Sequence, residues 1–392
     1  MRIALFTDTY PPFINGVSTS CFNLVQTMRN KGHQVLVITP NSDDSKELKI
    51  VDDTIYVPGI QLKKLYGYRL TTLYNNKLFN IVKNFKPDII HNQTDSTIGQ
   101  FSKIVQKRLK VPMVYTYHTA YEDYTYYITK GFLDRAAKIV IRNYARLVSE
   151  NSTEFITPSE KTMDYMRFAG SAIYMHVIPT GIDFSLFDEK KIDKEKTEQF
   201  KKEHGIKENT KVFLILGRIA KEKSMDISIK GYAAYVNKHP DVDTKLIIVG
   251  GGPQLQELQQ LVDTLGISHL VDFIGPVPAK EVPFYYHLAD IYTSASVTET
   301  QGLTFMEAMV AKDIVLARYD DNLSGTIIDG QTGFFFTNEE SFIEKAERAL
   351  ALSQEEREEI YKNAYQVIDI YSIEKFYENI LGVYNRAIKK YW

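Results

Sequence analysis

Two glutamates lie eight residues apart in the segment 294–307, Ser-Ala-Ser-Val-Thr-Glu-Thr-Gln-Gly-Leu-Thr-Phe-Met-Glu. Gly302 separates them, so the sequence predicts Glu299 in a loop and Glu307 about one turn inside a helix that begins near Leu303. This arrangement suits one carboxylate that reaches sugar hydroxyls and another that reaches a ribose. Alternatively, the two glutamates could be the acid and base of a glycosidase. The simplest alternative is that both are solvated side chains without a role in chemistry.

Positive side chains and glycines follow other predicted strands. Arg218 and Lys223 come after an apolar run, where arginine offers a bidentate fork and lysine a point charge to a diphosphate. Glycines 250–252 precede a predicted helix, and such glycines let backbone N–H groups approach an anion at the helix N-terminus. Gly16 has the same position after the first strand. The alternatives are plain strand-to-helix turns and a solvated basic turn.

Short apolar runs alternate with helix-like stretches along the chain, which is typical of α/β proteins with parallel sheets covered on both faces. The predicted strands are 2–7, 34–39, 55–57, 88–91, 113–117, 154–157, 211–216, 245–249, 271–274, 291–293 and 314–316. A Pro/Gly segment at 176–183 and a polar stretch at 188–210 predict a boundary between domains 1–182 and 183–371. Two doubly wound domains are expected to face each other across a cleft, at the strand ends where such sheets bind ligands.

The composition excludes several classes of protein. One cysteine, Cys21, cannot form an internal disulfide, and we expect a reducing compartment. No apolar run approaches the roughly 20 residues of a spanning helix, so we expect a cytoplasmic protein whose membrane contact is peripheral. Residues 1–182 carry 22 Lys and Arg against 15 Asp and Glu, whereas residues 183–392 carry 25 against 34. This imbalance suggests that one half faces an anionic surface or ligand, with drift in surface charge as the alternative.

Together these segments resemble glycosyltransferase family four, whose members are retaining enzymes of the GT-B fold. The matching segments follow the family's order along nearly the whole chain. They are Thr9-Tyr10-Pro11-Pro12, Asn15-Gly16-Val17, residues 178–183, Gly217-Arg218 with Lys223, residues 249–253, and Glu299 with Glu307. The resemblance implies a first Rossmann-like domain that faces acceptor and membrane, joined by the final helix, 372–392. It implies a second Rossmann-like domain that binds the nucleotide sugar.

The resemblance also implies roles for single residues. Arg218 and Lys223 would hold the donor diphosphate and stabilise it as it leaves, while Gly16 would approach a donor phosphate from the first domain. Glu299 would bind donor-sugar hydroxyls, and Glu307 would bind the ribose. The loops and the helix start would add further donor contacts, namely Gly251, Gly252, Thr300, Gly302, Leu303 and Thr304.

Residues 117–124, Tyr-His-Thr-Ala-Tyr-Glu-Asp-Tyr, are similar to a segment of bacterial diacylglycerol glucosyltransferases. This similarity places His118 at the reacting centre, and Tyr121 and Asp123 on the acceptor side. It implies transfer of a hexose, with glucose expected, from a UDP-sugar to the 3-hydroxyl of diacylglycerol. A same-fold transferase acting on a glycosylated lipid, a soluble sugar or a polysaccharide is an alternative. A non-catalytic nucleotide-sugar-binding membrane protein is another.

A basic and partly apolar stretch between residues 130 and 146 predicts a helix that could lie on an anionic membrane. Its cations recur at steps of three to five residues and are Lys130, Arg135, Lys138, Arg142 and Arg146. Residues 61–77 could extend the same patch. An ordinary amphipathic helix packed on a sheet is the alternative. With the lipid-type segment beside it, the stretch leads us to expect binding at the inner face of the cell membrane.

We expect neither a cofactor nor a metal, because Arg218 and Lys223 could neutralise the phosphates on their own. The nearest acidic pairs, Asp241 with Asp243 and Asp320 with Asp321, lie in polar turns. Nucleic acid is not an expected partner, since the basic residues lack the interleaved aromatics of a nucleic-acid module. The expected partners are a UDP-sugar, a lipid acceptor and an anionic membrane surface.

Overall fold

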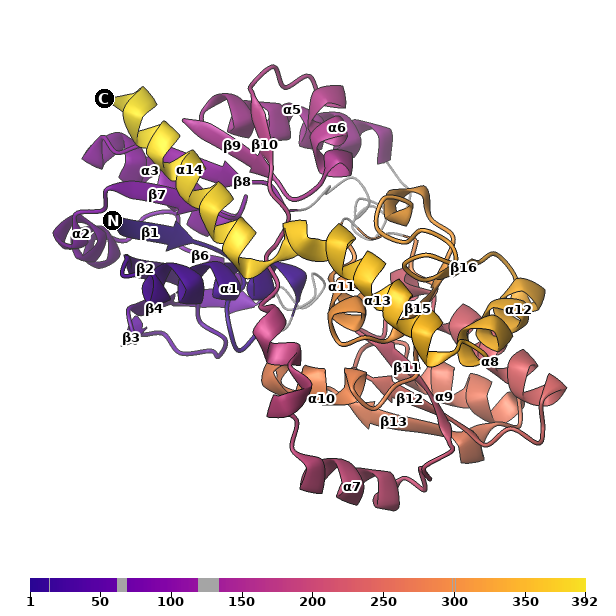
Figure 1. Ribbon diagram of the computed structural model, residues 1–392. Helices are drawn as coiled ribbons and strands as arrows, with labels where there is room; N and C mark the ends of the chain where they lie inside the picture. Colours follow the sequence, from indigo (N-terminus) through magenta and orange to yellow (C-terminus); the bar gives the residue numbers. More distant parts are fainter. Residues whose placement is uncertain (14, 62–68, 119–133, 298, 300) are drawn as a thin grey trace. The chain divides into compact units, whose positions relative to one another are not determined.

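The computed structural model describes residues 1–392 apart from 14, 62–68, 119–133, 298 and 300, and apart from the side chains of 134–138 and 141 (Figure 1). The chain divides into two units. The first contains residues 1–181 and 373–392, and the second contains residues 182–372. The last helix, α14 (Ile373–Tyr391), therefore belongs with the start of the chain.

In the described part of the first unit, eight strands form one sheet in the order β10-β9-β8-β7-β1-β2-β4-β3. Its pairings are parallel except for β3 with β4. The strands are β1 (Arg2–Phe6), β2 (Gln34–Pro40), β3 (Lys49–Val51), β4 (Thr54–Val57), β7 (Ile89–Asn92), β8 (Met113–Thr116), β9 (Glu154–Thr157) and β10 (Met175–Val177). The helices are α1 (Gly16–Asn30), α2 (Asn76–Phe85), α3 (Thr97–Leu109), α5 (Asp134–Glu150), α6 (Glu160–Phe168) and α14.

The central strand β1 shows why this sheet is buried on both faces. Side chains alternate across a strand, and β1 is apolar at every described position after Arg2. Ile3 and Leu5 pack in one cluster with α1 and α14, whereas Ala4 and Phe6 pack in another with α2 and α3. An unbroken apolar strand thus requires helices on both sides, and α14 provides part of one layer.

In the described part of the second unit, six parallel strands form a sheet in the order β13-β12-β11-β14-β15-β16. These strands are β11 (Lys211–Leu216), β12 (Thr244–Val249), β13 (Val271–Gly275), β14 (Ile291–Ser294), β15 (Ile314–Arg318) and β16 (Phe334–Phe336). The helices are α7 (Lys194–Glu203), α8 (Met225–Lys238), α9 (Leu255–Thr264), α10 (Val282–Tyr286), α11 (Leu303–Val310), α12 (Glu339–Leu350) and α13 (Gln354–Ile368). Short 3-10 turns are η2 (Phe184–Phe187), η3 (Glu189–Lys191), η4 (Lys221–Lys223), η5 (Ser268–Leu270), η6 (Ala279–Glu281), η7 (Asp321–Leu323) and η8 (Asp369–Tyr371).

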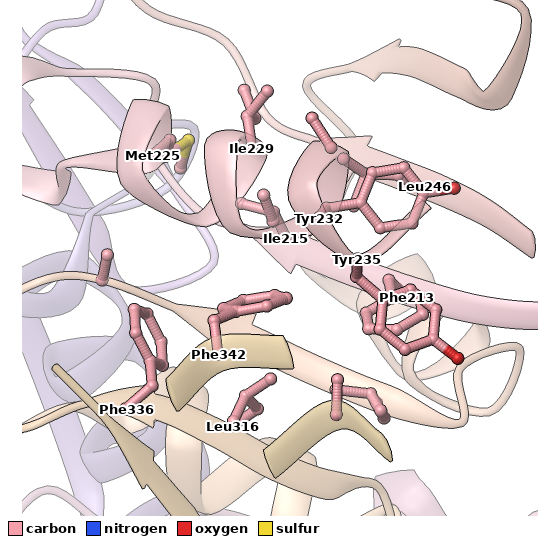
Figure 2. Close-up of a cluster of buried hydrophobic side chains, with 14 of the residues drawn as sticks. Phe213, Ile215, Met225, Ile229, Tyr232, Tyr235, Leu246, Leu316, Phe336 and Phe342 are labelled. Atoms are coloured by element: carbon pink, nitrogen blue, oxygen red, sulfur yellow. The ribbon is translucent and has the colours of Figure 1, made fainter. Parts of the chain in front are cut away.

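The second sheet also has a core on each face. Phe213 and Ile215 of β11 join the cluster under α8, α9 and α12, which Figure 2 shows, and the intervening Val212 and Leu214 join the opposite cluster. Within the first cluster, the rings of Phe213 and Tyr232 meet edge to face at 5.1 Å. Because both faces of the sheet are packed with apolar side chains, the segments that follow the strand ends are the expected place for a polar site.

The structure contains elements that the sequence pattern did not predict. The polar stretch 188–210, for which the sequence predicted no helix or strand, contains η3 and the helix α7. Asp193 caps α7 by accepting from the N–H groups of residues 195 and 196, so a local cap supports a helix with little apolar surface. The antiparallel hairpin β5 (Gly59–Gln61) and β6 (Arg69–Thr71) was also not expected.

No helix among the described residues is long and apolar enough to cross a membrane.

Two glycines allow loops of the second unit to cross. A Cβ at Gly250 would lie 1.8 Å from the carbonyl oxygen of Gly217, and one at Gly252 would lie 2.1 Å from that of Ile219. The same loops share backbone hydrogen bonds, including Ile219 N–H to Gly251 O at 3.0 Å. The glycines are therefore required by close backbone contact between the segments after β11 and β12.

We predict that Gly252→Ala lowers the free energy of unfolding by about 3 kcal/mol or more, because the backbone at Ile219 has to move to admit the methyl group. Gly205→Ala measures dihedral strain alone, since Gly205 has φ +68° with open space around it, and it should cost only about 1–2 kcal/mol. Gly382→Ala, at an exposed and unobstructed position within α14, should stabilise by about 0.5–1 kcal/mol. Urea denaturation measures all three, and equal losses at 205 and 252 would contradict the packing argument.

Candidate active site

The second unit brings the predicted cations together with carboxylates at the carboxyl ends of its strands. Lys223 lies at the end of η4, and its Nζ is 2.5 Å from Oε1 of Glu299 in the segment after β14. Arg218 follows β11 and donates to Glu222, four residues later. These side chains are partly buried, with Glu299 only 14% exposed. Pairing with a carboxylate offsets the desolvation of each cation.

Glu307 lies inside α11, in the second turn, as its spacing from Gly302 predicted. The hydroxyl of Tyr286 is 3.0 Å from Glu307 Oε2 and 3.1 Å from the carbonyl oxygen of Thr304. Burial raises the pKa of Glu307 from its ordinary 4.5 to about 7, and the hydrogen bond from Tyr286 opposes part of that rise. This carboxyl group therefore titrates near neutral pH.

The loops that should contact a donor begin the helices of both units. Gly302 has φ +73° and caps α11, so the helix begins at Leu303 as expected, with Thr304 accepting from the hydroxyl of Tyr292 at 2.8 Å. A Cβ at Gly251 would make ordinary contact with Pro276, and one at Gly16 would meet nothing within 4 Å. Gly252 is already explained by the loop crossing. Thr300 lies outside the described residues.

In the first unit, His118 lies just after β8 and its Nε2 donates to Oε1 of Gln93, which follows β7. Burial lowers the pKa of His118 to about 4, so the ring is neutral at pH 7. Gln93 also contacts His91, a histidine on β7 that is fully buried. His118 is therefore part of a polar group of residues at the carboxyl end of this sheet.

A buried carboxyl group lies at the same edge of the first sheet. Asp8 follows β1 and accepts from the hydroxyls of Thr94 and Ser96, and Ser96 also caps α3. Burial raises the pKa of Asp8 to about 6, while the two hydroxyls oppose the shift. Aspartate and glutamine side chains thus line the edge from which His118 projects.

The predicted acceptor residues lie mostly outside the described structure. Tyr121, Asp123 and Lys130 fall within 119–133, and the side chains of Arg135 and Lys138 are not described. The predicted basic helix is present as α5, which runs from Asp134 to Glu150. The Cζ atom of Arg142 in this helix lies 4.4 Å from the centroid of the Phe168 ring at the end of α6.

Among the described residues, no group of three or more histidine, cysteine, aspartate or glutamate side chains is placed to hold a metal. Asp243 instead accepts from Thr210 at 3.0 Å and from Lys207 at 3.2 Å. Asp320 caps the turn η7 by accepting from Asn322 N–H at 3.0 Å. One aspartate of each acidic pair therefore has a structural contact with neighbouring residues.

Comparison with known proteins identifies the family. The model for "Glycosyltransferase Family 4" matches residues 14–186, and that for "Glycosyl transferases group 1" matches residues 196–367. An α-monoglucosyldiacylglycerol synthase of Acholeplasma laidlawii is 34% identical over 88% of this chain and 86% of its own length. The chain belongs to glycosyltransferase family 4. A Streptococcus pneumoniae protein of the same name is 33% identical over 86% of this chain and 76% of its own.

Solved structures show the same fold. A glycosyltransferase from Rickettsia africae has a TM-score of 0.71 and 17% identity, covering 99% of this chain and 98% of that one. The Anabaena protein HepE, solved with UDP and glucose, has a TM-score of 0.74 and 16% identity, covering 98% of this chain and 99% of that one. The predicted GT-B fold of two Rossmann-like domains is confirmed, and this family 4 member is a glycosyltransferase.

The sequence alone did not predict several residues that lie at the carboxyl ends of the strands in the two sheets. Glu222 lies between Arg218 and Lys223 in the sequence, and its spacing of four from Arg218 was a signal for an ion pair. Tyr286, Gln93 and Asp8 gave no comparable signal. Their partners are distant in sequence, for example 21 residues between Tyr286 and Glu307.

We predict that Glu307→Gln changes how stability depends on pH. Folded Glu307 keeps its proton to about pH 7, whereas the unfolded chain loses it near pH 4.5. Rising pH therefore lowers the free energy of unfolding of the parent across this window. The variant has no carboxyl group at this position and does not lose stability in this way. Relative to the parent, Glu307→Gln should gain about 1–3 kcal/mol between pH 5 and pH 8.

Urea denaturation at both pH values measures this difference. Glu344→Gln, at a carboxylate that is 73% exposed, is the matched control and should follow the parent at both values. A pH-independent difference between Glu307→Gln and the parent would show that Glu307 titrates as an ordinary carboxylate.

Proposed function

We propose that this enzyme transfers glucose from UDP-glucose to the 3-hydroxyl of diacylglycerol at a membrane surface, with retention, to give an α-glucosyl diacylglycerol. The observation that carries the proposal is the 34% and 33% identity, over most of the chain, to two α-monoglucosyldiacylglycerol synthases. Relatives with other names, such as D-inositol 3-phosphate glycosyltransferase of Corynebacterium diphtheriae, are 27% identical over 63% of the chain.

The second unit supplies groups suited to a nucleotide sugar. Departure of UDP leaves negative charge on the diphosphate, and fixed cations in a partly dry site stabilise that charge. In the proposal, Arg218 and Lys223 meet the diphosphate, Glu299 accepts from sugar hydroxyls and Glu307 accepts from the ribose. The 2.5 Å contact between Lys223 and Glu299 supports this assignment, because it brings a phosphate-binding group beside a hydroxyl-binding group.

The proposed reaction needs no enzymic nucleophile. The acceptor hydroxyl attacks the anomeric carbon as the bond from that carbon to the diphosphate oxygen breaks, and UDP leaves with the bonding electrons. The hydroxyl proton passes to the leaving phosphate on the same face, which retains the anomeric configuration. Neutral His118 can orient the reacting hydroxyl by a hydrogen bond. The cations take the place of a metal in this proposal.

The first unit offers a surface suited to lipid. Val140 of α5 is 67% exposed and Phe168 of α6 is 69% exposed, and Ile139 and Leu147 are also exposed. Arg142 lies over Phe168, so a cation accompanies the exposed apolar groups. Apolar side chains with adjacent arginine suit the boundary between headgroups and acyl chains of an anionic bilayer. We propose that this face of α5 and α6 docks the enzyme peripherally at the inner surface of the cell membrane.

We predict that Arg218→Ala and Glu299→Ala each lower kcat/KM by about 100-fold or more, because each removes a contact to charge or hydroxyls of the donor. The assay follows transfer from UDP-glucose to diacylglycerol in mixed micelles, with products resolved by mass. Arg348→Ala is the matched control, since Arg348 also pairs with a glutamate, Glu356, at 2.7 Å but on the exposed helices α12 and α13.

Full activity of either site variant would refute the donor assignment. If the enzyme glucosylates monoglucosylated diacylglycerol or a soluble sugar and leaves diacylglycerol unused, that compound and not diacylglycerol is the acceptor. A donor screen in the same assay decides between glucose and other hexoses.

We predict that the double variant Val140→Asp, Phe168→Ser binds anionic vesicles at least about tenfold more weakly, because burial of each apolar side chain contributes roughly 1.5–3 kcal/mol. Co-sedimentation with vesicles of phosphatidylglycerol and phosphatidylcholine measures the binding. Ile370→Asp, at a side chain of the second unit that is 56% exposed, should bind like the parent. Equal binding by both variants would exclude the α5 and α6 face.

A further inference from the structure

A line of polar contacts joins the last helix of the chain to His118. Tyr384 of α14 places its hydroxyl 2.7 Å from Nδ1 of His91, and Thr116 Oγ1 lies 2.7 Å from Nε2 of the same ring. The amide nitrogen of Gln93 lies 3.1 Å from His91 Nε2, and Gln93 Oε1 accepts from His118 Nε2. Tyr384 and His91 are 0% exposed, and Gln93 and Thr116 are also buried.

The two hydroxyls determine how Gln93 is oriented. Each nitrogen of an imidazole ring makes one hydrogen bond along its in-plane direction, and the hydroxyls of Tyr384 and Thr116, each 2.7 Å from a different nitrogen of His91, are closer to those nitrogens than the Gln93 amide is. The amide nitrogen of Gln93 also lies 3.3 Å from Nδ1, so it rests against the ring instead of replacing either hydroxyl. An amide N–H is the favourable group to place against an aromatic ring. The carboxamide oxygen is therefore the atom that faces His118.

A carboxamide oxygen accepts hydrogen bonds and does not donate them. The contact from Gln93 Oε1 thus requires the proton of neutral His118 to be on Nε2, which leaves Nδ1 as the basic nitrogen. We propose that Tyr384, His91 and Gln93 are positioning residues that hold His118 as the Nε2–H tautomer, so that Nδ1 is presented to the substrate hydroxyl. The role of His118 in transfer rests on the proposed function, whereas the tautomer is a property of the free enzyme.

A purely structural role would not require this set of groups. Apolar side chains could fill the space between α14 and β7, and a buried polar network is favourable only when its members are satisfied. The same helix also provides a contrasting pair. Tyr377 of α14 places its hydroxyl 3.1 Å from His33 Nε2 in a partly buried contact, and the other ring nitrogen of His33 lies 3.1 Å from the N-terminal amino group.

Measurements of activity test the part of this network that includes Tyr384 of α14. Tyr384→Phe should lower kcat about tenfold while KM for UDP-glucose changes less than about twofold, because only the orientation of His118 is impaired. Tyr377→Phe removes the same atom from the same helix and should leave both constants unchanged. Thr116→Val should act like Tyr384→Phe, and Thr116→Ser, which keeps the hydroxyl, should restore the parent kcat. Equal kcat values for Tyr384→Phe and Tyr377→Phe would remove α14 from the proposal.

Nitrogen NMR of the enzyme labelled with ¹⁵N-histidine tests the tautomer without any substrate. The signal of His118, assigned by its loss in His118→Asn, should show the Nε2–H pattern at pH 7, and Gln93→Leu should convert it to a mixture of tautomers. An Nδ1–H or charged ring in the parent would overturn the proposal. If the tautomer is as expected but no glucose reaches diacylglycerol, the acceptor assignment fails and the positioning of His118 stands.

Discussion

The contact between Lys223 and Glu299 is the interaction on which the site of the second unit depends. A lysine and a glutamate 2.5 Å apart and partly withdrawn from water stabilise each other, and each would be costly to desolvate alone. Arg218 and Glu222, in the same segment after β11 as Lys223, form a second pair of this kind. Under the proposed function, a donor diphosphate competes with these carboxylates for the two cations, so its affinity is a difference between two ionic interactions.

Around His118, the first unit meets the cost of burying polar groups with neutral side chains. Its strand edge contains His91, Gln93 and His118, and burial lowers the pKa of both histidines so that neither is charged at pH 7. Neutral polar groups lose less on desolvation than ions do, so hydrogen bonds alone can satisfy them. This difference suits the proposed function, in which the second unit binds the donor and the first unit binds the acceptor. An anionic leaving group requires cations, whereas a lipid hydroxyl requires an oriented hydrogen-bonding partner.

Both arrangements follow from parallel sheets that are covered on each face. The central strands β1 and β11 are apolar almost throughout, so their own side chains offer no polar group. The polar groups of both arrangements therefore lie at or beyond the carboxyl ends of the strands, where such sheets bind ligands. The crossing of the loops after β11 and β12, which Gly250 and Gly252 permit, shows how closely these segments pack.

The sequence alone determined the α/β class, most strand positions and the family, because apolar periodicity and short motifs are local properties. It also placed Glu307 inside a helix and His118 after a strand, since Gly302 and the apolar run before His118 are visible in the chain. Only the tertiary structure decided the partners. Tyr384 reaches His91 across 293 residues and Lys223 reaches Glu299 across 76, and no spacing rule relates residues so far apart. The pKa of Glu307 likewise depends on its burial, which raises it, and on the hydrogen bond from Tyr286, which opposes the rise, and both come from packing.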